Sequence, residues 1–252
     1  MGGANPSPNS YGFRLYIAPD PTIGTKAKPA KSCKAILDAK QSLGDGAYWL
    51  DPDGNGTIGK FRTYCVFNPG VGWTMAMKIN GASKTFRYDS GLWTNNQGFN
   101  TNSVNFDTSQ AKLAPFWTMP VKKVLLSMKV GSTYRWLVVP KTASSLRAIF
   151  ATNKPHKTSL GRSAWKSLIS NSSLQLRCNA EGFNIGDSGA QVRIGIIGNN
   201  ENNCSSPDSR LGFGGRGNRC AQDYNNTCGN TARCGGDKGN RNTKVFGYVF
   251  VN

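Results

Sequence analysis

Apolar and polar positions alternate over short stretches of the chain, which predicts strands joined by turns and loops. Most apolar runs have strand length, and two of them flank a Gly-Ser-Thr turn in the manner of a hairpin. None approaches the roughly 20 apolar residues of a membrane-spanning helix, so no membrane span is expected. The predicted strands cover residues 47–50, 61–67, 72–77, 121–130, 134–139, 191–197 and 245–251.

Helices are expected in only two places. Ser32 can cap a short helix over residues 33–40, and residues 160–169 form the second candidate. Two stretches rich in polar residues, 80–110 and 198–243, predict long ordered loops, and a loop as long as the second usually has a function. With 30 glycines in 252 residues, the expected fold class is α+β, mostly β, with short helices, long ordered loops and disulfides.

The first 30 residues differ from the rest of the chain. Five prolines interrupt them, which predicts an extended docking arm over residues 1–30 and a recognition domain over residues 31–252. The apolar piece from Tyr11 to Ile17 could add a strand to the domain itself or to a neighbour's sheet, so other subunits of an assembly are expected partners. The N-terminus shows no basic segment followed by an apolar one, so no secretory signal is visible.

Seven cysteines and one histidine decide between a metal site and a disulfide framework. The cysteines form no C-x-x-C pair, and structural zinc sites usually need such close spacing. Disulfides are therefore expected, and they place the protein outside the reducing cytosol. Because seven is odd, at least one thiol stays free or pairs with another chain. The cysteines are Cys33, Cys65, Cys178, Cys204, Cys220, Cys228 and Cys234.

The net charge of +18 comes from 31 Lys and Arg residues against 13 Asp and Glu. A field of this sign attracts nucleic acid, anionic glycans, lipopolysaccharide or an acidic protein, although it can also serve solubility alone. The basic residues are spread along the whole chain, whereas nucleic-acid binding favours a clustered footprint. Cell-surface glycans and anionic surface polymers are therefore the expected partners, and nucleic acid is not.

Four short motifs follow one another in the first third of the chain. They are Ser-Cys-Lys-Ala-Ile-Leu at 32–37, Gly-Asp-Gly-Ala-Tyr-Trp-Leu at 44–50, Tyr-Cys at 64–65 and Gly-Trp-Thr at 72–74. In this order they resemble the start of fibrinogen-like C-terminal domains. The resemblance implies a disulfide between Cys33 and Cys65, because in that family the cysteine of the helix bridges to the one in the Tyr-Cys strand.

The C-terminal third is similar to the intelectin branch of this family and its bacterial and invertebrate relatives. The matching residues lie at 194–196, 203–205, 208–215, 228–230 and 246–251. The resemblance, over about residues 32–252, implies calcium sites and a pocket for a glycan or an acetylated ligand in this third. The His and Glu residues with which intelectins bind the sugar are absent, and Pro207 and Asp208 stand near their positions. The identity of the ligand therefore stays open.

Calcium takes six to eight oxygen ligands, and acidic residues are scarce in this chain. Those in the 198–243 stretch are therefore informative, and together with the resemblance they predict a calcium site. The same residue types also build turns and caps, so an ordinary loop is the alternative. The predicted metal ligands are Glu201, Asn203, Asp208 and Asp223.

A sugar pocket would combine aromatic faces with carboxylate and guanidinium groups, and the same stretch offers such a set. The predicted ligand-binding residues are Phe213, Arg219, Asp223 and Tyr224. Their alternative role is packing within the loop. Catalysis is not expected, because His156 is the only histidine and the sequence has no paired carboxylates or phosphate-binding motif.

These observations favour a non-enzymatic, lectin-like attachment module that binds glycans with the help of calcium. Its expected setting is extracellular, on a secreted adhesin or on the capsid or tail of a virus particle. The alternative is a structural assembly protein of a particle or filament that uses the fold without binding sugar. The two hypotheses differ in whether the 198–243 stretch faces solvent or is buried in protein contacts.

Overall fold

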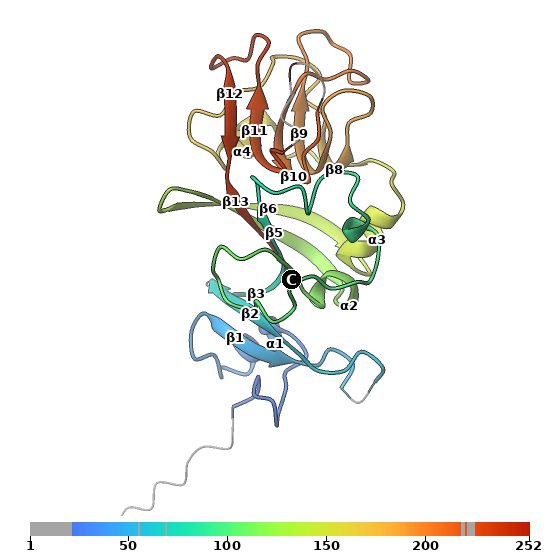
Figure 1. Cartoon of the computed structure of the whole chain (residues 1–252). Helices are drawn as coiled ribbons and strands as arrows, with labels where there is room; N and C mark the ends of the chain where they lie inside the picture. Colours follow the sequence, from blue (N-terminus) through green and yellow to red (C-terminus); the bar gives the residue numbers. More distant parts are fainter. Residues whose placement is uncertain (1–21, 55, 69, 218–219, 221–224) are drawn as a thin grey trace, which may run out of the picture.

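The computed structural model describes residues 22–54, 56–68, 70–217, 220 and 225–252. Within these residues the chain forms two antiparallel sheets and four short α-helices. The fold class is therefore α+β and mostly β, as predicted. Figure 1 shows the strands β1 to β3 at one end of the molecule and the second sheet at the other, with β13, β5 and β6 between them.

The first sheet has seven strands in the order β1-β2-β3-β13-β5-β6, with β4 paired to β3. The C-terminal strand lies between β3 and β5, so the last residues of the chain complete the middle of this sheet. Apart from β4, all its strands were predicted. The strands are β1 (Gly46–Leu50), β2 (Phe61–Asn68), β3 (Val71–Asn80), β4 (Ala111–Lys112), β5 (Val121–Val130), β6 (Thr133–Ala143) and β13 (Phe246–Val251).

The second sheet has six strands in the order β12-β11-β10-β9-β8-β7. Only β9 was predicted, and the long loop expected over residues 198–243 is wrong because β10, β11 and β12 lie within it. These strands are rich in Gly, Asn, Thr and Arg, so they lack the apolar alternation by which strands are usually found. The strands are β7 (His156–Lys157), β8 (Glu181–Ile185), β9 (Val192–Gly198), β10 (Ser209–Phe213), β11 (Cys228–Ala232) and β12 (Arg241–Lys244).

A row of four glycines crosses the second sheet. Gly182, Gly195, Gly212 and Gly229 are register partners on β8, β9, β10 and β11. Gly195 and Gly212 both have a backbone φ of 154°, a value that residues with a Cβ atom rarely adopt. A Cβ at Gly212 would also collide with the carbonyl oxygen of Ile194 on the neighbouring strand. The row lets the strands approach where no side chain would fit.

Gly212→Ala should destabilise the protein by roughly 3 kcal/mol or more, because the backbone is strained and the neighbouring strand blocks the methyl group. Urea unfolding measures the loss. Gly131→Ala is the matched control, since Gly131 also has a positive φ but no heavy atom lies near its missing Cβ. That control should lose only about 1 kcal/mol. Equal losses in the two variants would contradict the steric role of the row.

The helices are short and start at recognisable signals. Ser32 caps the first, and its hydroxyl oxygen accepts a hydrogen bond of 3.1 Å from the backbone N–H of Ala35. The helix predicted over 160–169 is confined to five residues. The helical elements are α1 (Cys33–Asp38), the 3₁₀ turn η1 (Gly91–Trp93), α2 (Pro115–Thr118), α3 (Leu146–Ala151) and α4 (Arg162–Lys166).

The first sheet buries apolar side chains on both of its faces. On the inner face, residues of β3, β5 and β13 pack with the helices and with Ile194, Ile196 and Leu211 of the second sheet in one continuous core. On the outer face, β3, β5 and β13 form a second cluster, which Val104 and Phe106 of the segment between η1 and β4 partly cover. That segment was predicted as an ordered loop, and its residues anchor it to the sheet.

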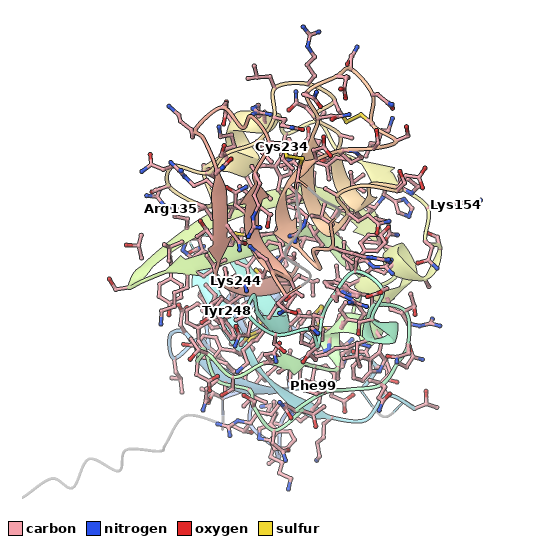
Figure 2. All side chains as sticks on the ribbon, turned by 45° about the horizontal axis from the view of Figure 1, so that its top comes forward. Phe99, Arg135, Lys154, Cys234, Lys244 and Tyr248 are labelled. Carbon is pink, nitrogen blue, oxygen red and sulfur yellow. A yellow bond between two sulfur atoms is a disulfide. The ribbon has the colours of Figure 1, made fainter. Side chains whose placement is uncertain are left out.

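Three disulfides cross-link the described residues. Cys33–Cys65 joins α1 to β2, as the resemblance implied, and the other two are Cys178–Cys204 and Cys220–Cys234. Cys228 is the odd thiol, and it is free and buried. Each bridge is expected to contribute roughly 2–4 kcal/mol. Figure 2 shows Cys234 near one end of the molecule and Phe99 toward the other.

Residues 22–30 lie against the open side of β1. Trp49 donates a backbone hydrogen bond of 2.8 Å to the carbonyl of Gly24, and Ala30 donates one of 3.1 Å to the carbonyl of Trp49. Of the predicted docking arm over residues 1–30, the structure describes only residues 22–30, and residues 1–21 lie outside the described residues. No helix among the described residues is long and apolar enough to cross a membrane.

Candidate functional site

Three of the predicted calcium ligands, Glu201, Asn203 and Asp208, lie on the turn between β9 and β10, and oxygens of the first two already accept hydrogen bonds. Asn203 Oδ1 accepts hydrogen bonds from the N–H (2.9 Å) and the hydroxyl (2.7 Å) of Ser205, and Glu201 Oε1 accepts one from Asn200. Among the described residues no three His, Cys, Asp or Glu side chains form a group that could hold a metal ion. Asp223 lies outside the described residues, so the calcium site with Asp208 stays a prediction.

Of the predicted sugar-binding residues, only Phe213 is among the described residues. The Phe213 ring is fully buried in the core, next to the backbone of Gly247. It has no exposed face on which a sugar could stack, so its assignment is wrong, and its place on β10 is the reason. Arg219, Asp223 and Tyr224, the other members, lie outside the described residues.

Asp237, another acidic residue of this stretch, is held by basic groups. Its carboxylate forms ion pairs with Arg162 and Lys166 of α4 and accepts a hydrogen bond from the backbone of Leu174. Burial alone would raise the pKa of Asp237, but these hydrogen bonds prevail and lower it to about 2. This carboxylate fixes α4 to the loop after β11.

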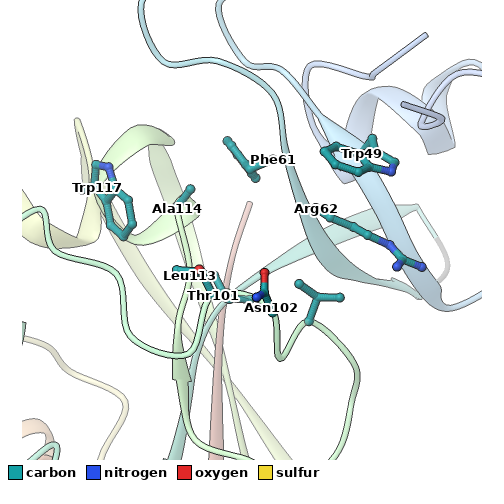
Figure 3. A pocket seen from close by; sticks show the side chains of 9 residues that line it. Trp49, Phe61, Arg62, Thr101, Asn102, Leu113, Ala114 and Trp117 are labelled. Atoms are coloured by element: carbon teal, nitrogen blue, oxygen red, sulfur yellow. The ribbon is translucent and has the colours of Figure 1, made fainter. Parts of the chain in front are cut away.

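A cavity of about 480 Å³ opens at the far end of the first sheet, away from the second sheet. It lies between strands β1 and β2, the loop before β4 and helix α2. Figure 3 shows Trp49 and Trp117 on opposite sides of it, with Phe61 between them. The lining residues are Trp49, Phe61, Arg62, Thr101, Asn102, Val104, Leu113, Ala114 and Trp117.

The cavity, which we call the Trp49–Trp117 pocket, has apolar walls and a polar rim. The three aromatic side chains are partly exposed, whereas Val104 and Leu113 beneath them are buried. Arg62 is exposed and stands directly opposite Trp49 in the β1–β2 register. The rim is completed by the exposed side chains of Thr101 and Asn102.

The buried ammonium group of Lys112 supports the Trp117 wall. Its Nζ donates to the carbonyl and to the side-chain Oδ1 of Asn95, both at 2.8 Å. It also lies 4.7 Å from the ring centroid of Phe116 and 5.4 Å from that of Trp117. Burial, and secondarily the charge of Arg147, lower the pKa of Lys112 to about 8. The lysine thus ties α2 to the loop that faces it.

A second buried ammonium group, that of Lys78, fixes the other side of the pocket. Its Nζ donates to Ser103 Oγ (2.9 Å), to the carbonyl of Asn105 (2.9 Å) and to Asp107 Oδ1 (2.6 Å). Burial lowers the pKa of Lys78, and the hydrogen bond to Asp107 opposes this shift. Three acceptors within five residues therefore fix the loop that carries Thr101.

The pocket is electrostatically positive. No Asp or Glu is among its lining residues, whereas Arg62 stands at its rim. Lys26 Nζ lies 5.5 Å from the ring centroid of Trp49, and Lys60 donates to the carbonyl of Lys26 beside it. An anionic ligand would therefore be favoured in this pocket over a cationic one.

The pocket was not found in the sequence, because its residues come from four separate segments. Trp49 and Phe61 were predicted to lie on strands, and Trp117 was assigned to no element. The available signal was the pairing of Trp49 with Arg62, which follows once the hairpin of β1 and β2 is aligned. Nothing in the sequence alone brings Trp117 to the same place.

The part of the chain that is similar to known proteins contains most of the residues that line this pocket. The model of the fibrillar collagen C-terminal domain matches residues 18–115. Collagen EMF1-alpha of Ephydatia muelleri is 36% identical over 105 residues, which is 40% of this chain and 18% of that protein. The collagen alpha-1(XXVII) chain of Rattus norvegicus is 33% identical over 64 residues, 25% of this chain and 3% of that protein. The chain thus spans less than a fifth of either relative.

The family match supports the fibrinogen-like part of the resemblance and not its intelectin branch. Among solved structures, the chain is similar to the lamprey fibrin D-dimer, crystallised with a peptide ligand, at 16% identity and a TM-score of 0.33. That alignment covers 48% of this chain and 36% of the other. At this level the structural likeness carries no argument about function.

Lys78→Met should destabilise the protein by roughly 2–3 kcal/mol, because it leaves the loop at Ser103–Asp107 without its buried donor. Thermal and urea unfolding measure the loss. Lys34→Met is the matched control, since Lys34 pairs with Asp38 on the surface of α1, where both side chains are at least half exposed. The control should change stability by less than about 0.5 kcal/mol. A Lys78 variant as stable as the control would refute the anchoring role.

Proposed function

We propose that the chain is a non-enzymatic, extracellular binding module that takes an acidic sugar residue of a glycan into the Trp49–Trp117 pocket. The observation that carries the proposal is the combination of two opposed indole rings with a guanidinium group at the rim. The three disulfides fit an oxidising setting. The collagens that the chain is similar to are the reason to expect an extracellular structure.

The aromatic walls suit the apolar face of a sugar ring. Trp49, Phe61 and Trp117 present ring surface that is partly exposed and held in place, so stacking costs little conformational freedom. Asn102 and Thr101 at the rim can hydrogen-bond to hydroxyl groups. A purely apolar ligand would leave these polar groups without a role.

The guanidinium group of Arg62 favours an acidic sugar over a neutral one. Guanidinium and carboxylate can form two parallel hydrogen bonds, which are stronger than those between neutral groups. The lining has no carboxylate that would compete for Arg62. The overall charge of +18 would also steer an anionic polymer toward the protein from a distance.

A structural assembly module is the second candidate, and the match to the fibrillar collagen C-terminal domain favours it. In that case the pocket would have no ligand of its own. Neither the fold nor the matches bear on a virus particle, so we propose an extracellular setting alone. None of the predicted calcium ligands lines this pocket, so chelation can test the predicted calcium site separately.

Binding of an unsulfated galacturonate oligomer, measured by calorimetry, tests the proposal. Trp117→Ala should weaken binding at least about tenfold through the lost stacking surface. Arg62→Gln should weaken it by about the same factor, because a charge-assisted hydrogen bond is removed. A neutral galactose oligomer should bind Arg62→Gln and the unaltered protein equally.

Two control variants separate the pocket from general attraction by charge. Arg177→Gln removes an exposed arginine near the second sheet, and Trp136→Ala removes a tryptophan of β6 that is 40% exposed. Both should bind the oligomer as the unaltered protein does. If all four variants lose affinity alike, or if duplex DNA binds as well as the oligomer, the pocket is not the site. No binding at all would favour the structural candidate.

A further inference from the structure

The strand β6 is the longest open sheet edge in the described part of the chain. It pairs with β5 on one side, and none of the backbone hydrogen bonds found there joins residues 133–139 to another segment. The opposite edge of the sheet, β1, is covered by residues 24–30. Pro140 has no N–H to donate, so the seven residues before it are the part of β6 that could accept another strand.

The open edge also carries exposed apolar side chains. Trp136 and Val138 are 40% and 41% exposed, and they alternate along β6 on the outer face of the sheet. Trp136 continues the aromatic cluster of that face, since its ring centroid lies 6.0 Å from both Phe106 and Phe250. Soluble proteins usually protect an edge of this length with charges or a covering segment. None of the described residues covers this edge with backbone hydrogen bonds.

The chain itself contains a segment that fits this edge. The residues from Tyr11 to Ile17 read Tyr-Gly-Phe-Arg-Leu-Tyr-Ile, so Tyr11, Phe13, Leu15 and Ile17 would share one face of a strand. The segment has seven residues, the same number as the open part of β6. It lies among the 21 residues that precede the first described residue, Thr22. We infer that it adds to β6 of a second copy of the chain as an eighth strand, with its apolar face covering Trp136 and Val138.

The segment cannot reach β6 of its own molecule. Thr22 precedes the residues that cover β1, and β6 lies five strands away across the sheet. At about 4.8 Å between strands this separation is roughly 24 Å, and a further strand lies beyond it. The four residues between Ile17 and Thr22 span at most about 18 Å when fully extended. A neighbour's edge has no such limit.

The resulting contact is head to tail. The donor segment belongs to one edge of the sheet and the acceptor to the other, so each molecule can give its segment to one neighbour and receive that of another. Contacts of this kind build chains or rings rather than closed pairs. Because each copy carries +18, added salt should strengthen the assembly by screening the repulsion. Binding of an acidic glycan in the Trp49–Trp117 pocket should respond to salt in the opposite direction.

Sedimentation velocity of the full 252-residue chain tests the inference. The unaltered protein should show larger species as its concentration rises, more so at high salt. Leu15→Pro, which removes a backbone N–H from the donor segment, should sediment as a monomer. Trp136→Lys with Val138→Lys, which places charges on the acceptor edge, should do the same. Leu176→Lys is the control, because Leu176 is 68% exposed and lies beside the second sheet, away from the proposed contact. This variant should assemble as the unaltered protein does.

Mixing the two defective variants gives the sharper result. The Leu15→Pro variant keeps its acceptor edge and the Trp136→Lys/Val138→Lys variant keeps its donor segment. Together they should form a one-to-one complex and nothing larger. The inference is overturned if the unaltered protein stays monomeric at every concentration. It is also overturned if the Leu15→Pro variant assembles to the same extent as the unaltered protein. A failed mixture with both variants folded, judged by their melting, overturns it as well.

Discussion

The outer face of the first sheet depends on the hydrogen bonds of the buried Lys78 ammonium group to the loop between η1 and β4. A lysine without exposure is unfavourable unless its charge and all its protons are satisfied, and here the loop between η1 and β4 supplies three acceptors within five residues. That loop carries the rim of the Trp49–Trp117 pocket at Thr101 and the aromatic cover of the outer face at Phe106. Lys112 repeats the arrangement at the other end of the loop. Two buried charges thus give a long polar segment one conformation.

The C-terminal strand connects the two sheets. β13 follows the second sheet and inserts between β3 and β5 of the first, so the sheet begun by residues 46–80 is completed only by residues 246–251. The region similar to collagens, residues 18–115, contains β1 to β4 but not β13, β5 or β6. The remainder of the chain therefore completes a sheet to which the matched region contributes four strands, and it adds the second sheet. The pocket lies almost wholly in the matched region.

Sequence reasoning found what local signals encode. The cap at Ser32, the hairpin of β5 and β6, and the apolar runs of β2 and β13 follow from side-chain period and turn chemistry, and the family motifs supplied the Cys33–Cys65 bridge. β10 and β11 were missed because they pack through a row of glycines and buried polar residues, so their signal lies in the register between strands and not along the chain. β12 was missed because its four residues are all polar. Phe213 was misassigned because β10 was missed. The pocket could not be predicted, since its residues come from four separate segments that only the tertiary structure brings together.

The central claim is that the Trp49–Trp117 pocket recognises an acidic sugar residue. The indole N–H signals of the six tryptophans can be followed individually by NMR while the galacturonate oligomer is added. The account predicts that the signals of Trp49 and Trp117 shift together and saturate, while those of the buried Trp93 and Trp165 and of Trp136 on β6 stay in place. Saturable binding that leaves both Trp49 and Trp117 unperturbed would contradict it.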